Sequence, residues 1–293
     1  RGTTSLLEQS YERYLNKMPL NPKTSPYTTA GIYSSLIGQK LGLCGGNFSI
    51  SSACTSSLNS IGTAYHLIKS GLFSSVLAGG SEAPLTDFTY EMLTRAKVMA
   101  AIQKKDELPL KSFGICSRRK GMVLGEASGL TLLSKEKTQN SIAELVGFSM
   151  ASEAKGLTGL SENAYSLSAS IRKSLTNAKL QPSDIDLLAI HGSGTQKGDR
   201  AEMNAYLEIF GGNPPAMLIS KWVTGHTLGA TGVLSLGFAV EAMKNEVLPS
   251  PQYETFDGVV TSFRQKPKFS MITGLGFGGG ASSLIIKNLP QTT

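Results

Sequence analysis

The fold is decided by the stretch I-S-S-A-C-T-S-S-L-N-S-I, which runs from Ile50 to Ile61. Polarity alternates from Asn47 to Ser52, which predicts a short strand, and the apolar spacing from Cys54 to Lys69 predicts a helix that ends at Gly71. A strand, a tight turn and a helix form the repeating unit of α/β proteins. The turn would place the Cys54 sulfur at a helix N-terminus, where unpaired N–H groups and the helix dipole favour a thiolate.

The same alternation continues along the chain. Further helices are expected over 4–15, 29–41, 88–101, 164–178, 199–210 and 228–244. Further strands are expected over 74–80, 129–133, 142–148, 186–191, 217–220, 269–273 and 282–287, with loops over the proline-rich segment 18–26 and the polar segment 104–111. This order predicts an α/β protein with mostly parallel sheets and helices on both faces.

Length and charge narrow the class of protein. The 293 residues suit one large α/β domain or two fused halves, and the 32 glycines cluster in turns. The net charge of +7 predicts an acidic partner, with a merely solvating charge excess as the alternative. Basic groups such as Lys104-Lys105 and Arg118-Arg119-Lys120 are scattered and not interleaved with aromatic residues, which argues against a nucleic acid partner.

The cysteines indicate a reducing, cytoplasmic location. Cys44, Cys54 and Cys116 form no close pair, which argues against a disulfide framework and against a C-x-x-C motif. The sequence contains no run of about 18 apolar residues, the length needed to span a membrane. Since the chain begins with Arg and opens directly into a helical pattern, we expect an upstream portion to be missing.

Two histidines lie in glycine-rich turns. His191 ends an expected strand and opens H-G-S-G-T-Q-K-G-D, while His226 lies in K-W-V-T-G-H-T-L-G-A-T-G before an expected helix. Such positions more often face a cleft than a core, whereas His66, inside a helix, is expected to be structural. A cysteine and two imidazoles are the minimum set for acyl transfer through a thioester. Taken alone, Cys54 is more readily explained as a small buried core residue. No metal is expected, because Cys54, His191 and His226 lack a clustered ligand spacing.

The tail G-L-G-F-G-G, residues 274–279, matches the dinucleotide fingerprint only in its letters. A strand pattern follows it instead of a helix, so no nucleotide site is expected. Such a turn could bring backbone amides to a reacting atom as an oxyanion hole, with Phe277 as an aromatic plug. An ordinary hairpin turn is the alternative.

Six motifs, in order, resemble those of the β-ketoacyl-[acyl carrier protein] synthases, the elongating condensing enzymes. They are S-A-C-T-S-S at 52–57, A-G-G-S-E-A at 78–83, R-K-G-M-V-L-G-E-A-S-G at 119–129, H-G-S-G-T-Q-K-G-D-R-A-E at 191–202, K-W-V-T-G-H-T-L-G-A-T-G at 221–232 and G-F-G-G at 276–279. The resemblance implies a thiolase-like fold with five layers, α-β-α-β-α, built from two duplicated halves. We place the halves at 1–137, with the nucleophile, and at 138–293, with both histidine motifs.

The resemblance also implies a reaction and its partners. The reaction would be the decarboxylative Claisen condensation of malonyl-acyl carrier protein with a cysteine-bound acyl chain, in fatty acid or polyketide synthesis. Both substrates would be carried on the phosphopantetheine of acyl carrier protein, and no further cofactor is expected. The enzyme would be a homodimer, or a heterodimer with a ketosynthase-like subunit.

The family's reacting residues carry over to four positions. Cys54 matches the nucleophile, and His191 and His226 match the histidines that hydrogen-bond the enolate oxygen. The backbone N–H groups of Cys54 and Phe277 match the oxyanion hole, and Phe277 also matches a gating phenylalanine.

Supporting roles carry over to five further positions. Lys221 and Glu202 match a charge pair that orders the first histidine motif. Thr158, Ser193 and Thr195 match residues that hydrogen-bond the phosphopantetheine arm.

The chain departs from the family pattern, and two other readings stay open. The part before Cys54 is much shorter than usual, the terminal loop reads G-F-G-G-G-A where the family has G-F-G-G-T-N, and Trp222 and Leu275 replace a serine and an aromatic residue. One alternative is a non-catalytic, chain-length-setting partner subunit, although such subunits typically lack the cysteine. The other is a thiolase, which normally has a second cysteine near the C-terminus.

Overall fold

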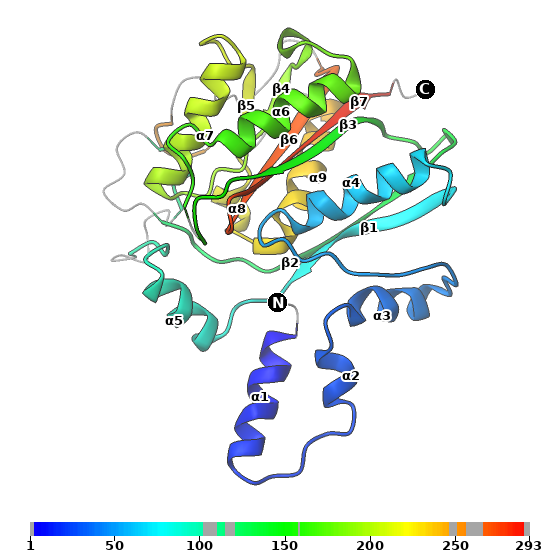
Figure 1. Cartoon of the computed structure of the whole chain (residues 1–293), viewed down its shortest axis with the longest axis vertical. Helices are drawn as coiled ribbons and strands as arrows, with labels where there is room; N and C mark the ends of the chain where they lie inside the picture. The colour runs from blue at the N-terminus through cyan, green and yellow to red at the C-terminus, as the bar shows by residue number, and fades with distance from the viewer. Residues whose placement is uncertain are drawn as a thin grey trace.

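The computed structural model describes residues 3–101, 110–114, 121–157, 159–245, 251–255 and 266–289. They form two β-sheets with helices on and between them (Figure 1). The helices are α1 Thr4–Leu15, α2 Thr24–Thr28, α3 Ile32–Leu41, α4 Ser56–Lys69, α5 Asp87–Arg95, α6 Tyr165–Ala178, η1 Pro182–Asp184, α7 Gln196–Ile209, α8 Lys221–Thr224, η2 Leu228–Ala230 and α9 Thr231–Asn245. The strands are β1 Ser75–Glu82, β2 Ala127–Ser134, β3 Ala143–Ser152, β4 Leu187–Ala189, β5 Ala216–Leu218, β6 Phe269–Gly276 and β7 Gly280–Asn288. Most of the polar loop expected over 104–111, and the basic group at 118–120, fall outside the described residues.

The larger sheet has the strand order β3-β7-β6-β4-β5. β4 pairs in parallel with β5 and β6, whereas β7 pairs antiparallel with both β6 and β3. The prediction of mostly parallel sheets is therefore wrong. Only residues 277–279 separate β6 from β7, and so short a connection can join strands only as an antiparallel hairpin.

The smaller sheet pairs β1 with β2 in antiparallel register, from Ser75 opposite Ser134 to Glu82 opposite Ala127. The strand predicted over 47–52 is absent: Ser52 makes an isolated bridge with Cys54, and no described strand pairs with the segment. An extended segment becomes part of a sheet only when a neighbouring strand takes its backbone hydrogen bonds. The alternating pattern alone could not supply that neighbour.

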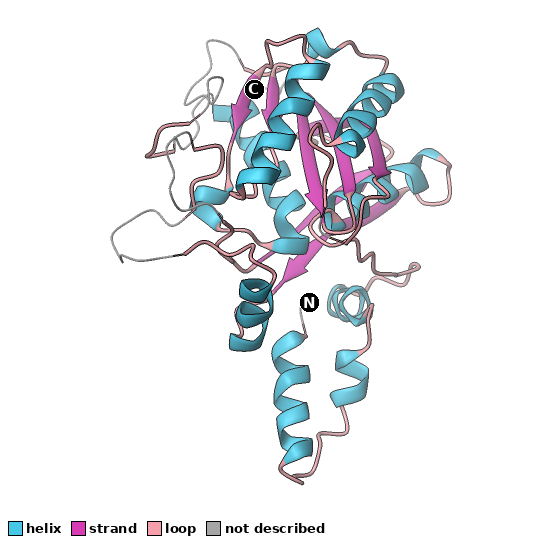
Figure 2. Ribbon diagram, turned by 60° about the vertical axis from the view of Figure 1, so that its left-hand side comes forward, coloured by secondary structure: helices cyan, strands magenta, loops and turns pink. Residues whose placement is uncertain are grey.

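The described residues stack in four layers, helix, sheet, helix, sheet (Figures 1 and 2). α6 and α7 cover one face of the larger sheet, and Leu167 and Met271 belong to the core between them. α4 and α9 lie between the two sheets, where Leu58 and Ile272 belong to a second core. These four layers correspond to four of the five in the α-β-α-β-α stacking that the family resemblance implies.

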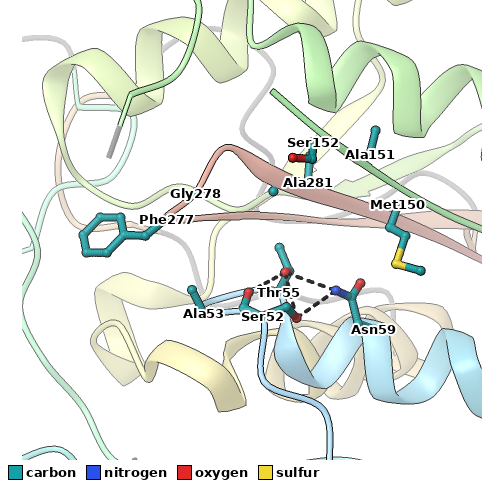
Figure 3. Close-up of a pocket in the computed structure, with 11 residues that line it drawn as sticks. Ser52, Ala53, Thr55, Asn59, Met150, Ala151, Ser152, Phe277, Gly278 and Ala281 are labelled. Atoms are coloured by element: carbon teal, nitrogen blue, oxygen red, sulfur yellow. Dashed lines mark hydrogen bonds between the residues drawn. The ribbon is translucent and has the colours of Figure 1, made fainter. Parts of the chain in front are cut away.

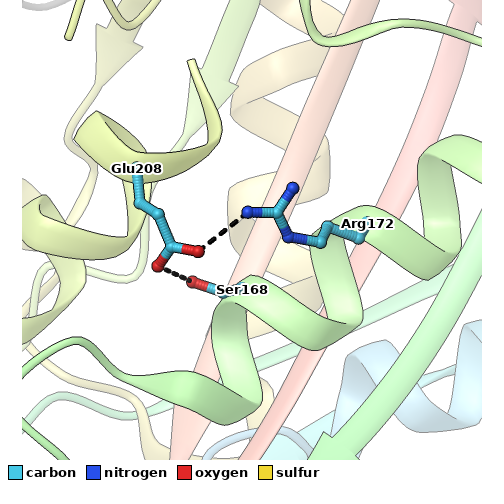
Figure 4. Close-up of polar contacts among 3 residues, drawn as sticks. All are labelled: Ser168, Arg172 and Glu208. Atoms are coloured by element: carbon cyan, nitrogen blue, oxygen red, sulfur yellow. Dashed lines mark hydrogen bonds and ion pairs between the residues drawn. The ribbon is translucent and has the colours of Figure 1, made fainter. Parts of the chain in front are cut away.

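A surface ion pair links the two outer helices (Figure 4). Arg172 of α6 donates to Glu208 of α7 at 2.8 Å, and Ser168 of α6 donates to the other carboxylate oxygen at 3.2 Å. Both charged side chains are about half exposed. Such exposed pairs contribute little to stability, so the buried apolar layer holds these helices in place.

Helix ends differ from prediction where the backbone adopts special conformations. α5 ends at Arg95 rather than 101, and Lys97 follows with a left-handed φ of 57°, which stops a helix. The short helix α2 lies in the proline-rich stretch predicted as a loop. Its Pro26 stands in the first turn, where the missing N–H costs nothing.

The N-terminal helices α1 to α3 project away from the sheets (Figure 1). α1 has the predicted bounds, yet Leu7, Tyr11, Tyr14 and Leu15 on it are each 56% to 65% exposed. The rings of Tyr11 and Tyr14 stack with centroids 6.4 Å apart. So much exposed apolar surface indicates an interaction surface. Within the described part of the chain, no helix combines the length and apolar character needed to cross a membrane.

Candidate active site

Cys54 lies in a strained turn at the start of α4. Ala53 has a φ of 51°, in the left-handed region that non-glycine residues rarely adopt. The turn is braced by hydrogen bonds from the Ser56 hydroxyl to the Ala53 carbonyl at 2.6 Å and from the Ser52 amide to the Ser56 hydroxyl at 2.9 Å. Cys54 stands two residues before the first residue of α4 and is 7% exposed. The helix start predicted for this cysteine is thus displaced by only two residues.

His191 follows β4, and both polar atoms of its backbone are held by buried side chains. Its N–H donates to Glu202 Oε1 at 2.6 Å, and the Gly192 N–H donates to Glu202 Oε2 at 2.8 Å. Lys221 Nζ donates to the His191 carbonyl oxygen. Glu202 and Lys221 are 0% and 1% exposed. The two residues expected to form a charge pair therefore meet at the His191 peptide.

Burial and neighbouring charges have opposite effects on the pKa values of Glu202 and Lys221. Burial raises the pKa of Glu202, while hydrogen bonds from Tyr206, Gly192 and His191 and the nearby Lys221 counteract the rise. Burial lowers the pKa of Lys221 to about 8, with attraction to Glu202 and to Cys54 opposing the fall. Lys221 therefore remains largely cationic at neutral pH, close enough to Cys54 for the two to interact electrostatically.

The second imidazole is held by its own turn and by a neighbouring segment. The His226 N–H donates to the Val123 carbonyl at 2.7 Å. Its Nδ1 atom accepts the Leu228 N–H at 3.1 Å and lies 3.3 Å from the Thr231 hydroxyl. With Nδ1 accepting, a neutral His226 carries its proton on Nε2.

The two imidazoles lie together and are neutral. Their ring centroids are 5.3 Å apart and the rings are inclined at 76°. Burial lowers the pKa of His226 to about 3, with the charge of Lys221 adding to the effect. Burial, Lys221 and His226 together lower the pKa of His191 well below its usual value. Neutral imidazoles can donate hydrogen bonds to a developing negative charge without first releasing a proton.

The β6–β7 hairpin brings Phe277 next to the cysteine turn. A Cβ atom added at Gly276 would lie 3.3 Å from the Cys54 amide nitrogen, so a larger residue would require the cysteine turn to shift by a few tenths of an ångström. Beyond it, the Gly278 N–H donates to the Leu157 carbonyl at 2.7 Å, and the Glu153 N–H donates to the Gly279 carbonyl at 3.0 Å. The hairpin tip is thus fastened to the loop that follows β3.

A cavity of about 460 Å³ opens beside the cysteine turn (Figure 3). Ser52, Thr55 and Asn59 form a hydrogen-bonded floor, in which Asn59 Nδ2 donates to Ser52 Oγ at 2.8 Å. Met150 faces them from β3, and Phe277 lines the cavity at the hairpin tip. Cavities of this size accommodate small-molecule ligands.

The expected phosphopantetheine residues are only partly placed. The hydroxyls of Ser193 and Thr195 lie 2.8 Å apart in the turn after His191. Ser193 is 9% exposed, and Thr195 is partly buried. Thr158 lies outside the described residues.

Sequence reasoning missed two buried side chains of α7. Asp199 accepts the Phe113 N–H at 2.8 Å and the Gly194 N–H at 3.0 Å, and burial raises its pKa to about 7. Tyr206 donates its hydroxyl hydrogen to Glu202 at 2.6 Å. The spacing from Asp199 to Glu202 and on to Tyr206 follows one helix face, and this was the signal available in the sequence.

Two family models match consecutive parts of the chain. Residues 3–139 match the N-terminal domain of the beta-ketoacyl synthases, and residues 142–253 match their C-terminal domain. The chain belongs to the beta-ketoacyl synthase family.

Relatives in this family include polyketide and fatty acid enzymes. A "Putative polyketide beta-ketoacyl synthase 1" of Streptomyces halstedii is 30% identical over 86% of this chain and 63% of its own length. The "3-oxoacyl-[acyl-carrier-protein] synthase 2" of Staphylococcus aureus is 27% identical over 98% of this chain and 74% of its own. The chain spans 63%, 67% and 66% of the length of three Streptomyces relatives.

Solved structures of the family confirm the thiolase-like fold. A type II polyketide ketosynthase, solved with its acyl-carrier protein and bound to a hexaketide, has a TM-score of 0.87 at 21% identity over 98% of this chain and 75% of its own. A beta-ketoacyl synthase from Burkholderia phymatum has a TM-score of 0.84 at 24% identity over 99% and 73%. A ketosynthase from Xenorhabdus doucetiae, solved with its chain length factor, has a TM-score of 0.82 at 24% identity over 97% and 71%.

Proposed function

We propose that this protein is a β-ketoacyl-[acyl carrier protein] synthase, an acyltransferase that condenses malonyl-acyl carrier protein with a cysteine-bound acyl chain. The proposal is supported chiefly by one arrangement: the rings of His191 and His226 lie together, and the buried Lys221 ammonium group interacts electrostatically with both rings and with Cys54. The ring separation of 5.3 Å between His191 and His226 allows both to contact one oxygen atom. Fatty acid or polyketide synthesis is the proposed setting.

In the first step, the Cys54 thiolate attacks the carbonyl carbon of an acyl thioester. A bond forms between the Cys54 sulfur and that carbon, and the phosphopantetheine thiolate leaves and takes up a proton. The Lys221 cation supports the negative sulfur electrostatically. The amides of Cys54 and Phe277 are the proposed donors to the oxyanion, and the close passage of Gly276 past the Cys54 amide supports this.

In the second step, a malonyl thioester loses carbon dioxide, and the electrons of the broken carbon–carbon bond form an enolate. Its oxygen accepts hydrogen bonds from His191 and His226, whose neutral state follows from their burial beside Lys221. The enolate carbon then attacks the acyl carbonyl and releases the Cys54 thiolate. Glu202 and Lys221 keep the His191 backbone in position throughout.

The proposed carrier of both substrates is the phosphopantetheine arm of an acyl carrier protein, with no additional cofactor. Ser193, Thr195 and Thr158 are the proposed contacts of that arm, and Phe277 the gate at its inner end. The net charge of +7 suits an acidic protein partner. A reducing cytoplasm, in which Cys54 is not oxidised, is the proposed location.

We further propose that the protein acts as a dimer, with a second copy or with a ketosynthase-like subunit. The exposed apolar side chains of α1 support such an interface. The division into halves at residues 137 and 138 is likewise proposed.

A chain-length-setting partner subunit without activity is the second candidate. One relative in fold was solved as a ketosynthase with its chain length factor, and that pairing motivates the alternative. Against it, the chain retains Cys54, and the rings of His191 and His226 lie 5.3 Å apart. Release of labelled carbon dioxide from malonyl-acyl carrier protein distinguishes the two. A synthase releases it and loses the activity in the His191→Ala, His226→Ala double variant, whereas a partner subunit releases none.

A further inference from the structure

Tyr206 carries a polar group into the buried core between α7 and the larger sheet. Its side chain is 0% exposed, and its hydroxyl oxygen lies 2.6 Å from Glu202 Oε1 and 2.6 Å from Thr273 Oγ1. An ionised carboxylate only accepts hydrogen bonds, so the Tyr206 hydroxyl donates to Glu202 and accepts from Thr273. A phenylalanine would fill nearly the same volume without the cost of burying a hydroxyl. The hydroxyl is therefore explained by its two partners.

The first partner holds a histidine of the site. Glu202 Oε1 accepts the His191 N–H at 2.6 Å as well as the Tyr206 hydroxyl, and Oε2 accepts the Gly192 N–H at 2.8 Å. The i to i+4 spacing places Tyr206 one helical turn after Glu202, on the same face of α7. Tyr206 is thus the side-chain donor that fixes where the carboxylate stands relative to the His191 peptide.

The second partner belongs to the strand that leads to Phe277. Thr273 is 1% exposed on β6, pairs with Ser283 of β7, and stands three residues before Gly276 at the end of the strand. Its hydroxyl also lies 3.5 Å from the Ala189 carbonyl of β4. One hydroxyl group therefore connects the carboxylate behind His191 with the strand that carries the hairpin.

We propose that Tyr206 is a positioning residue of the condensation: its hydroxyl fixes the Glu202 carboxylate, and through it His191, relative to strand β6 and the Phe277 hairpin. The role rests on the proposed function for its catalytic consequence, but its structural part does not. Tyr206 touches no reacting atom and acts through Glu202. Lys221 and Asp199 also act electrostatically on this carboxylate, and neither replaces the hydroxyl hydrogen bond.

Tyr206→Phe removes this hydroxyl, and two further variants complete the test. Thr273→Val removes the link to β6 while leaving Tyr206 bonded to Glu202. Tyr65→Phe is the matched control, since the Tyr65 hydroxyl makes a long 3.4 Å contact with the Val146 carbonyl, away from the histidine turns. Thermal unfolding first establishes which variants fold.

Two readouts are compared across variants of the whole 293-residue chain, with Cys54 acylation as a control. The chain has three histidines, so ¹⁵N-histidine spectra can resolve each ring, with His66 as an internal reference on α4. The other readout is the pH profile of carbon dioxide release from malonyl-acyl carrier protein. Cys54 acylation, followed by intact mass, monitors the step that does not need His191.

In Tyr206→Phe we expect the His191 signals to move while those of His66 stay in place. Carbon dioxide release should fall about ten- to a hundredfold, as expected for a small displacement in a reacting site, with acylation retained. The acidic limb of the pH profile of carbon dioxide release should move to higher pH. The hydrogen bond from Tyr206 lowers the pKa of Glu202, and loss of this bond lets that pKa rise. Thr273→Val should move the His191 signals less. Tyr65→Phe, whose ring lies 5.2 Å from that of His66, should leave the His191 signals and the pH profile unchanged.

Unchanged His191 signals in a folded Tyr206→Phe protein would overturn the proposal. So would an unchanged acidic limb in a variant that still releases carbon dioxide. If Tyr206→Phe does not fold, Thr273→Val decides by its His191 signals, and unchanged signals in that variant would overturn the proposal. If the wild-type protein releases no carbon dioxide, the proposed function fails, and the histidine spectra alone then decide whether Tyr206 positions His191.

Discussion

The Nδ1 atom of His226 accepts the backbone N–H of Leu228 at 3.1 Å, which leaves the ring proton on Nε2. Because Leu228 opens the turn before α9, the tautomer is set by local backbone geometry. The ring therefore presents a donor to its surroundings while remaining neutral. Its contact with His191 makes a pair of neutral rings, which suits stabilisation of an enolate better than removal of a proton.

Because His226 is buried in its neutral form, the protein should lose stability in acid. The folded-state pKa of about 3 lies below the unfolded value of 6.5, so only the unfolded state takes up a proton between them. The wild-type free energy of unfolding should fall by about 1.4 kcal/mol per pH unit below pH 6.5, relative to His226→Gln. Urea unfolding at pH 7.5, 6.0 and 5.0 measures this. A constant difference between the two proteins over this range would contradict the neutral, buried ring.

Replacement of Lys221 should strongly destabilise the protein, because it removes a buried ammonium group. Lys221→Met leaves the His191 carbonyl without its donor and the Glu202 charge without its counterion, and such losses cost about 3 to 5 kcal/mol. Lys244→Met, which removes an exposed pair with Glu241, should cost less than about 1 kcal/mol. Chemical denaturation of both variants checks the contrast, and equal costs would argue against a central role for Lys221.

Asp199 gives the opposite pH dependence to His226. Its pKa of about 7 in the folded protein exceeds the ordinary value of 3.8, so its stabilising contribution is complete below pH 3.8 and is lost as pH rises through 7. The wild-type protein should therefore lose stability relative to Asp199→Asn between pH 4 and 7. Parallel denaturation series at pH 4.5, 6 and 7.5 test this, and a gap that moves the other way would refute the raised pKa.

Alanine substitutions at Gly276 and Gly237 should have different effects, the first on acylation and the second on overall stability. A Cβ at Gly276 would lie 3.2 Å from the Ser52 carbonyl oxygen, so Gly276→Ala should displace the cysteine turn and slow acylation about tenfold or more. Gly237, in α9, has no atom within 4 Å of an added Cβ, and Gly237→Ala should stabilise the protein by about 0.5 to 1 kcal/mol. Acylation rates and unfolding midpoints of both variants provide the measurement. Normal acylation in Gly276→Ala would show that the close approach is not needed.

The sequence was sufficient to predict elements whose signal is local. α1 has the predicted bounds, and β1, β2, α6 and α7 lie within a few residues of prediction, because apolar periodicity records which face each element buries. The strand predicted over 47–52 is absent because its formation depends on more than the local pattern. Its alternation is compatible with a strand, but strand formation depends on a neighbour that a local pattern cannot reveal.

The site was predicted through its motifs and not through its packing. His191 and His226 were found from glycine-rich turns, and the structure brings their rings together. Tyr206 was missed because its partner Thr273 lies on a strand distant in sequence, and a buried tyrosine on an apolar helix face looks like any core residue. Asp199 begins the helix predicted over 199–210, but its role was missed because its contact with Phe113 depends on a segment from the first half of the chain.

The central claim is that Cys54 is an acyl-accepting nucleophile. The most direct test incubates the full chain with an acyl-[acyl carrier protein] thioester and measures its intact mass, beside Cys54→Ala and Cys44→Ala. We predict a mass increase of one acyl group in the wild type and in Cys44→Ala, and none in Cys54→Ala. Acylation that persists in Cys54→Ala, or a wild-type protein that is never acylated, would contradict the account.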